Sequence, residues 1–214
     1  MEHIAIDLGR RYSQVCIRIE TGEITHEEKL ATSVLSTWLS ERSPARVVLE
    51  TCSEAFVIAE RAKADRHDVR VVPAMLVRQL GVGQRGLKND TRDARALSEA
   101  SCRLELPSVH IPSASSRALK DLCTSRELLV KMRTSTVCRV RSALPGAGIA
   151  PVRATPNSLP GKLRKKLTGE HAELLSRIEP VLRVLESLNA EVKVYDKELR
   201  ELAKSDPLCR RLMS

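Results

Sequence analysis

The first half of the chain alternates strand-like and helix-like segments in an order that few folds can accommodate. Short apolar runs with strand periodicity occupy residues 3–9, 12–20, 24–31, 45–52 and 68–73. Helix-like segments cover residues 34–42 and 53–66, and Ser53 is the expected N-cap of the second. The order is three meandering strands followed by strand–helix alternation (βββαβαβα). It predicts an α/β fold, with a mixed sheet flanked by helices on both faces.

Four acidic residues stand where this topology brings distant segments together. Asp7 ends the first strand, and Glu50 stands near the end of the fourth. Asp90 and Asp93, in "KNDTRDARAL", are three residues apart and therefore share one face of a helix. We expect the four carboxylates to meet at one edge of the sheet. Such a cluster would need hard divalent cations to neutralise it.

The expected cluster predicts a particular chemistry. Two divalent cations about 4 Å apart align a water or hydroxyl against a phosphodiester and stabilise the leaving oxygen. We therefore predict that Asp7, Glu50, Asp90 and Asp93 are both metal ligands and catalytic residues, with Mg²⁺ or Mn²⁺ as the cofactor. A single acidic residue is more often a solvated surface group. The prediction rests on the acids together with the topological order.

Positive charge is concentrated in one part of the chain. Residues 103–166 hold 13 of the 36 Lys and Arg residues but only three of the 27 acids. A local basic excess of this kind is expected of a surface that meets nucleic acid. Because the chain has only four aromatic residues, base stacking has little scope, so we expect salt-sensitive binding through phosphates. The predicted nucleic-acid contacts are Lys88, Arg92, Arg95, Arg117, Lys120, Arg126, Lys131, Arg133, Arg139, Arg141, Lys162, Arg164, Lys165 and Lys166.

The second half is predicted to be helical. A basic helix covers residues 113–144, a Pro- and Gly-rich linker covers 145–161, and a further helical segment covers 162–214. Together with a domain over residues 1–112, these are the expected parts of the chain. Apolar residues in the last part alternate gaps of three and four, which favours a coiled coil with a second subunit. Folding back onto the basic helix is the alternative. The seam consists of Ile178, Val181, Leu185, Leu188, Val192, Tyr195, Leu199 and Leu202.

Several classes of protein are disfavoured by the sequence. No apolar run approaches the roughly 18 residues that a membrane span requires. The N-terminus "MEHIAIDLG" has an acid where a signal peptide would be basic, so we expect a cytoplasmic protein. The six cysteines form no CxxC pair and no His stands at ligand spacing, which argues against a zinc site or a disulfide framework.

Four segments, taken in order, resemble a known family. "AIDLGRRYSQVCI", "VVLETCSEAF", "VRVVPAMLVRQL" and "KNDTRDARAL" together resemble the N-terminal domain of the DEDD transposases, the IS110 family of insertion-sequence recombinases. The resemblance runs from residue 3 to about 104. It implies a RuvC-like ribonuclease H fold in which Asp7, Glu50, Asp90 and Asp93 form the acidic tetrad. It also implies divalent metal, DNA cleavage and strand transfer, a structured guide RNA and a bacterial cytoplasmic location.

The sequence departs from the family pattern in two places. Family members commonly have Gly soon after the second acid, where this chain has "ETCSEAF". In the family a second domain follows, with a "PGVG"-like turn and a catalytic serine, whereas this sequence ends at "DPLCRRLMS". We therefore expect that these residues alone do not complete recombination, and whether they form an enzyme stays open.

Three other functions are compatible with parts of the sequence. The first is a truncated, non-catalytic nucleic-acid-binding module, and the second is a stand-alone Holliday-junction resolvase of the RuvC type. The third starts from "IDLGRRYS", which also resembles the first phosphate loop of actin- and Hsp70-like ATPases. The second phosphate loop and the Gly-rich adenosine motif of those ATPases do not appear in the sequence.

Overall fold

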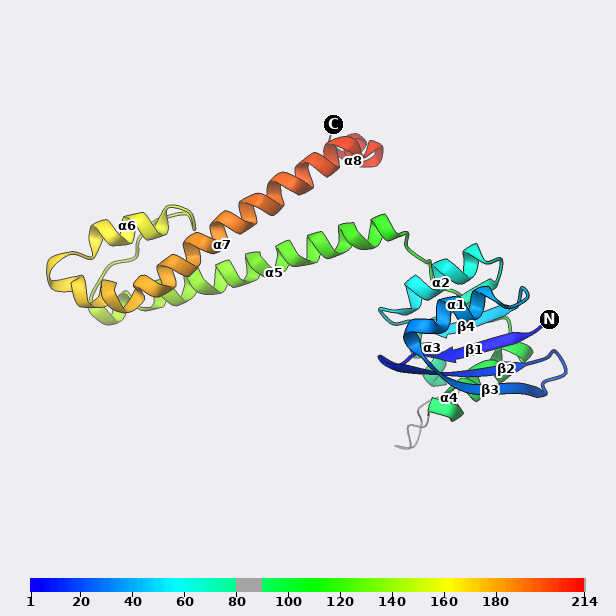
Figure 1. Cartoon of the computed structure of the whole chain (residues 1–214). Helices are drawn as coiled ribbons and strands as arrows, with labels where there is room; N and C mark the ends of the chain where they lie inside the picture. Colours follow the sequence, from blue (N-terminus) through cyan, green and yellow to red (C-terminus); the bar gives the residue numbers. More distant parts are fainter. Residues whose placement is uncertain (80–89, 214) are drawn as a thin grey trace. The chain divides into compact units, whose positions relative to one another are not determined.

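Five strands form one mixed sheet in the order β3-β2-β1-β4-β5 (Figure 1). The computed structural model describes residues 1–79 and 90–213. The three N-terminal strands form an antiparallel meander, while β4 runs parallel to β1 and β5 runs parallel to β4. The strands are β1 (His3–Asp7), β2 (Tyr12–Arg18), β3 (Ile24–Ala31), β4 (Arg46–Glu50) and β5 (Asp68–Val72).

Helices cover both faces of the sheet because the strands are apolar on both sides. One face, which carries Ile4 and Ile6, packs against α1 (Leu35–Ser40) and α2 (Ala55–Ala64). The other face, which carries Ala5 and Val48, packs against α3 (Ala74–Gln79) and α4 (Asp90–Arg103). This three-layer arrangement and strand order confirm the predicted ribonuclease H-like, RuvC-like α/β fold (Figure 1).

Several element ends differ from the sequence prediction. A short 3-10 helix, η1 (Thr32–Val34), precedes α1. The second helix begins at Ala55 with Glu54 as its N-cap, so the prediction that Ser53 caps it was wrong. No side-chain hydrogen bond caps this end. The start of the helix is instead stabilised by packing, since Ala55, Ile58 and Ala59 are buried in the core on the face of the sheet that carries Ile4 and Ile6.

Residues 115–214 form a second, helical unit, separate from the first unit of residues 1–114. Its core joins Val137 and Val140 of α5, and Leu144 just after that helix, to apolar residues of α6 and α7. The predicted linker 145–161 includes the start of α6 and contributes buried Ile149 and Leu159 to this core. The elements are α5 (Ala114–Ser142), η2 (Pro145–Ala147), α6 (Leu159–Lys166), η3 (Gly169–His171), α7 (Ala172–Ser205) and α8 (Pro207–Met213).

The predicted heptad seam lies along α7 and is covered unevenly. Its first part is buried within the unit, where Ile178 and Leu185 pack against the α5 and α6 residues of the core. Its last residue, Leu202, is 43% exposed. The first part therefore folds back onto its own chain, whereas the last residue of the seam is exposed. None of the helices that the structure describes is long and apolar enough to cross a membrane.

Candidate functional site

The ends of β1 and β4 bring two of the predicted acids side by side. The parallel pairing aligns Ile6 with Leu49, so Asp7 and Glu50 follow at the same level. Adjacent strands lie about 4.8 Å apart. Because side chains alternate along a strand, both carboxylates point to the face that carries Ala5, which is the face covered by α4. The sequence prediction that these two acids share an edge of the sheet agrees with this geometry.

Helix α4 is oriented so that its first turn approaches the same edge. Ser101, near its end, hydrogen-bonds through Oγ to His3 Nδ1 at 2.8 Å, at the start of β1. One turn earlier, Ser98 Oγ donates to Cys16 Sγ at 3.2 Å, and Cys16 pairs with Ala5 in the middle of β1. The helix therefore runs antiparallel to β1. Asp93 lies in its first turns and is half-buried.

The described side chains do not complete a metal centre. Among the side chains of residues 1–77 and 91–212, no three acidic, imidazole or thiol groups stand close enough to hold an ion. Asp90 begins α4, but its side chain lies outside the described residues, as does the whole of Lys88. The donor chemistry of Asp7, Glu50 and Asp93 nevertheless fits Mg²⁺ or Mn²⁺, which prefer carboxylate oxygens.

The turn after Asp7 is held by a network that sequence reasoning did not identify. Thr32 Oγ1 donates to the carbonyl of Gly9 at 2.6 Å, and its backbone N–H donates to the carbonyl of Arg11 at 3.0 Å. Ser13 Oγ lies 2.8 Å from Thr32 Oγ1. A Cβ at Gly9 would overlap the carbonyl oxygen of Tyr12, so only glycine fits here. These contacts fix the backbone that leaves the carboxylate edge.

Some of the predicted nucleic-acid contacts are engaged in ion pairs within their own unit. Arg95 donates to Glu27 Oε1 of β3 at 2.6 Å, and this bonding holds the pKa of the Glu27 carboxyl below its usual value. Arg126 Nε donates to Asp196 Oδ1 at 2.6 Å, which links α5 to α7. Lys131 pairs with Glu127 one turn away at 2.8 Å on the exposed surface of α5. Sequence reasoning could not foresee the two long-range partners.

Arg164 has the most extensive ion pairing of these cations. Its Nη2 donates to Glu179 Oε1 at 2.7 Å and to Glu186 Oε2 at 2.9 Å. The two carboxylates raise the pKa of the guanidinium above its usual value. Arg164 thus ties α6 to two residues of α7 that lie about two turns apart, and a role in binding nucleic acid would come in addition to this one.

Three further cations hydrogen-bond to backbone carbonyls of the connection between α5 and α6. Arg141 Nη2 donates to Ala154 at 2.8 Å, Lys162 Nζ donates to Arg153 at 2.8 Å, and Lys166 Nζ donates to Ala150 at 3.2 Å. A cation that is bonded to a carbonyl keeps its charge. These residues therefore still contribute to the positive potential of the unit.

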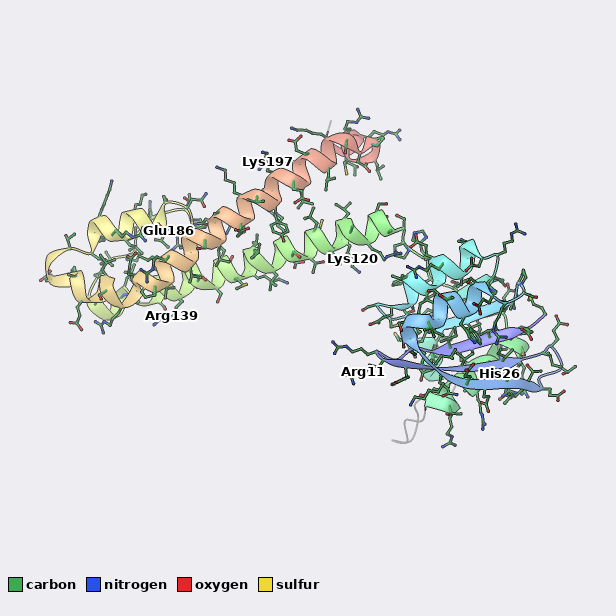
Figure 2. All side chains as sticks on the ribbon, in the orientation of Figure 1. Arg11, His26, Lys120, Arg139, Glu186 and Lys197 are labelled. Carbon is green, nitrogen blue, oxygen red and sulfur yellow. The ribbon has the colours of Figure 1, made fainter. Side chains whose placement is uncertain are left out.

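The remaining predicted contacts lie at or near the surface. Lys120, Arg139 and Lys165 are exposed on α5 and α6, and Figure 2 shows the first two projecting from α5. Arg92 is exposed on α4, whereas Arg117 is half-buried. These residues keep the prediction of a basic nucleic-acid surface open.

One more predicted contact lines a hollow of about 520 Å³ between α5 and α7. Arg133 shares this hollow with Lys193, Arg200 and Asp196. Sequence reasoning missed Lys193 and Arg200 because it confined the basic surface to residues before 167. The placement of α7 beside α5 brings these cations into one hollow, which Glu186 also lines.

Comparison with known proteins gives a family match and several relatives. The family model of the IS110-type DEDD transposases, described as a transposase, matches residues 4–149. A probable family 20 transposase of Pseudomonas aeruginosa is 23% identical over 218 residues, covering 100% of this chain and 64% of that protein. The transposase of insertion sequence element IS1111A from Coxiella burnetii is 25% identical over 222 residues, covering 99% of this chain and 58% of that protein.

A solved structure also matches part of the chain. It is RuvC of T. thermophilus in complex with a Holliday junction substrate, with a TM-score of 0.33 and 15% sequence identity. The match covers 46% of this chain and 90% of that one. The relatives named above are longer than this chain, which spans 64% and 58% of their lengths.

Proposed function

Because the chain belongs to the IS110-type DEDD transposases, we propose that its carboxylate edge takes part in DNA strand cleavage and transfer. The observation that carries the proposal is the parallel pairing of β1 with β4, which sets Asp7 beside Glu50 on the α4 face. The antiparallel course of α4, with Asp90 and Asp93 in its first turn, supports it further.

In this proposal Asp7, Glu50, Asp90 and Asp93 hold Mg²⁺ or Mn²⁺ through their oxygens. When bound, such an ion would neutralise the carboxylates and would polarise the phosphodiester. The chain itself supplies the positioning. Buried residues of β1 and β4, such as Ile6 and Leu49, hold the two paired strands side by side, which keeps Asp7 and Glu50 at the same level of the sheet.

We propose further that the cations of the second unit bind DNA and a structured guide RNA through phosphates. The support is the exposure of Lys120, Arg139 and Lys165 together with the basic residues around the hollow between α5 and α7. Phosphate contacts do not depend on the base sequence, and the affinity that they provide falls steeply as the salt concentration rises.

The last part of the proposal is assembly into a homo-oligomer through the exposed end of the α7 seam. Leu202 is 43% exposed, and Tyr195 and Leu199 of the seam are only partly buried. Large apolar side chains along a helix that continues a heptad pattern favour pairing with a second helix. The same end of α7 in a second copy is the simplest partner.

The carboxylate proposal predicts that Asp7→Asn weakens divalent metal binding while leaving the fold intact. Removing one of two neighbouring carboxylates removes a ligand, and it also relieves like-charge repulsion. We expect the Mn²⁺ dissociation constant, measured by isothermal titration calorimetry, to rise about tenfold or more, as is typical when a metal site is disturbed. Any Mn²⁺-dependent nicking of DNA should be lost as well.

Asp65→Asn is the matched control, because Asp65 ends α2 on the opposite face of the sheet and undergoes the same chemical change. Equal Mn²⁺ affinity of the two variants would refute the proposed site. Binding of nucleic acid without any metal-dependent cleavage would instead favour the non-catalytic binding module.

A further inference from the structure

A row of side chains crosses the sheet from the carboxylate edge toward β3. Asp7 pairs with Gln14 of β2, and Gln14 pairs with Lys29 of β3. Directly paired residues point to the same face, so Gln14 and Lys29 share the face of Asp7. The contact of Arg95 in α4 with Glu27, two residues before Lys29, confirms that this is the α4 face.

Tyr12 lies on the same face, two residues beyond Gln14 toward the turn. Its side chain is 58% exposed. The whole chain contains only four aromatic residues, and Tyr12 is one of them. The Lys29 Nζ lies over its ring, 5.4 Å from the centroid. An exposed aromatic ring next to an exposed lysine therefore stands beside the carboxylate edge.

The backbone under this pair is rigid. The hydrogen bonds of Thr32 to Gly9 and to Arg11 hold the turn that precedes Tyr12. Arg11 is exposed in this turn, and Figure 2 shows its side chain projecting away from the sheet. A ring that is held in place loses little conformational freedom when a ligand stacks on it.

We propose that Tyr12 and Lys29 form a strand subsite, in which Tyr12 stacks on an unpaired base and Lys29 contacts the neighbouring phosphate. Arg11 adds a second positive charge to the subsite. Two strand spacings, about 10 Å, separate Lys29 from Asp7 across the sheet. A nucleic-acid strand that lies across the sheet can therefore reach both. The link to cleavage rests on the proposed function, but the binding itself does not.

Another explanation for the pair is that it only protects the edge of the sheet. Edge strands often carry lysine, which discourages pairing with other chains. That role requires the charge of Lys29, but it does not require an exposed aromatic ring beside it. Stacking on a base uses both features, because bases stack on aromatic rings while cations bind the adjacent backbone.

The direct test is photocrosslinking with oligonucleotides that carry 5-iodouracil. The full chain is irradiated with single-stranded DNA, or with RNA of the same sequence, in EDTA. The absence of divalent metal makes the result independent of the carboxylate site. We expect a crosslinked peptide that contains Tyr12, and the comparison of DNA with RNA identifies which strand occupies the subsite. Crosslinks confined to residues 115–214 would overturn the proposal.

Affinity measurements on variants give a second readout. Tyr12→Leu should lose the crosslink and weaken binding of a short single strand about 5- to 100-fold, the range for one stacked base. Tyr12→Phe should behave like the wild type because it retains the ring. Lys29→Ala should lower the slope of log affinity against log salt by about 0.7, the value for one phosphate contact of a single strand.

Lys63→Ala is the charge-matched control, since Lys63 is exposed on α2 and lies on the other side of the sheet. Circular dichroism checks that every variant is folded. If Tyr12→Leu binds and crosslinks like Tyr12→Phe, the subsite does not exist. Asp7→Asn separates the two proposals, because it should weaken metal binding yet retain the Tyr12 crosslink.

Discussion

At the scale of single residues, charged groups in this chain have partners that no local pattern reveals. Arg95 stands next to the predicted tetrad in the sequence, which suggested a contact with nucleic acid. In the structure it forms a pair of hydrogen bonds with Glu27, a residue 68 positions away. The helical spacing of Arg95 was visible in the sequence. The strand that lies opposite it was not.

His3 leads to a prediction for the dependence of stability on pH. Its imidazole is buried at the start of β1 and hydrogen-bonded to Ser101. Burial, and secondarily the charge of Arg46, lowers its pKa below the usual 6.5. As the pH falls, His3 therefore binds a proton more readily in the unfolded chain than in the folded chain. The stability that neutral His3 confers is fully present above pH 6.5 and is lost as the pH falls.

We therefore expect the free energy of unfolding, measured with urea at pH 8, 7, 6 and 5, to decrease toward pH 5. His3→Gln should be less stable at pH 8, because it disturbs a buried hydrogen bond, but its decrease toward pH 5 should be smaller. Subtracting the pH curve of His3→Gln from that of the wild type cancels the contribution of the other four histidines, which both proteins share. Parallel curves would show that His3 does not cause the pH dependence.

At the scale of elements, α7 contains a buried stretch and an exposed stretch that its heptad pattern does not distinguish. Leu182 and Leu185 are fully buried in the core of the second unit, and Arg164 of α6 holds the same stretch of helix from outside. Beyond Val192, the apolar positions become increasingly exposed. A regular seam therefore contains a part that is buried within the chain and a more exposed part toward its end.

The exposed part is the place to test assembly. Leu202→Glu should shift the chain toward monomer in light scattering, because a charge at a helix–helix seam opposes pairing. Leu188→Glu would be a poor test, since Leu188 is only 7% exposed and the change would disrupt the unit itself. Ser205→Glu, on the same helix but outside the seam, is the control. If wild type and both variants are monomers, assembly through this seam is refuted.

At the scale of the whole molecule, the described residues form separate hydrophobic cores for the two units. The cores of the first unit lie on the two faces of the sheet, and that of the second unit joins α5, α6 and α7. Units with their own cores commonly unfold as separate cooperative transitions.

We expect differential scanning calorimetry to resolve two transitions. Leu182→Ala should destabilise only the second unit, by about 2–5 kcal/mol for a buried leucine, or roughly 10 °C or more in Tm. Leu49→Ala should lower only the transition of the first unit, because Leu49 is buried under the sheet. A single transition that both substitutions shift equally would show that the units unfold together.

The sequence by itself determined the order and type of the elements in the first unit and the face on which each strand residue lies. Period-two alternation places Asp7 with Ala5, and Glu50 with Val48, whatever the neighbouring strands are. The same local signal located the helices but missed where α2 begins, because burial of Ala55 rather than a capping side chain sets that end.

Only the tertiary structure decided which elements are neighbours. The pairing of β1 with β4, the register that aligns Asp7, Gln14 and Lys29, and the partners of Arg95 and Arg164 all join residues far apart in sequence. Such contacts depend on how the apolar faces of several elements pack together. The periodicity of any single segment therefore does not predict them. For the same reason, the exposed Tyr12 became a candidate site only when β3 placed Lys29 beside it.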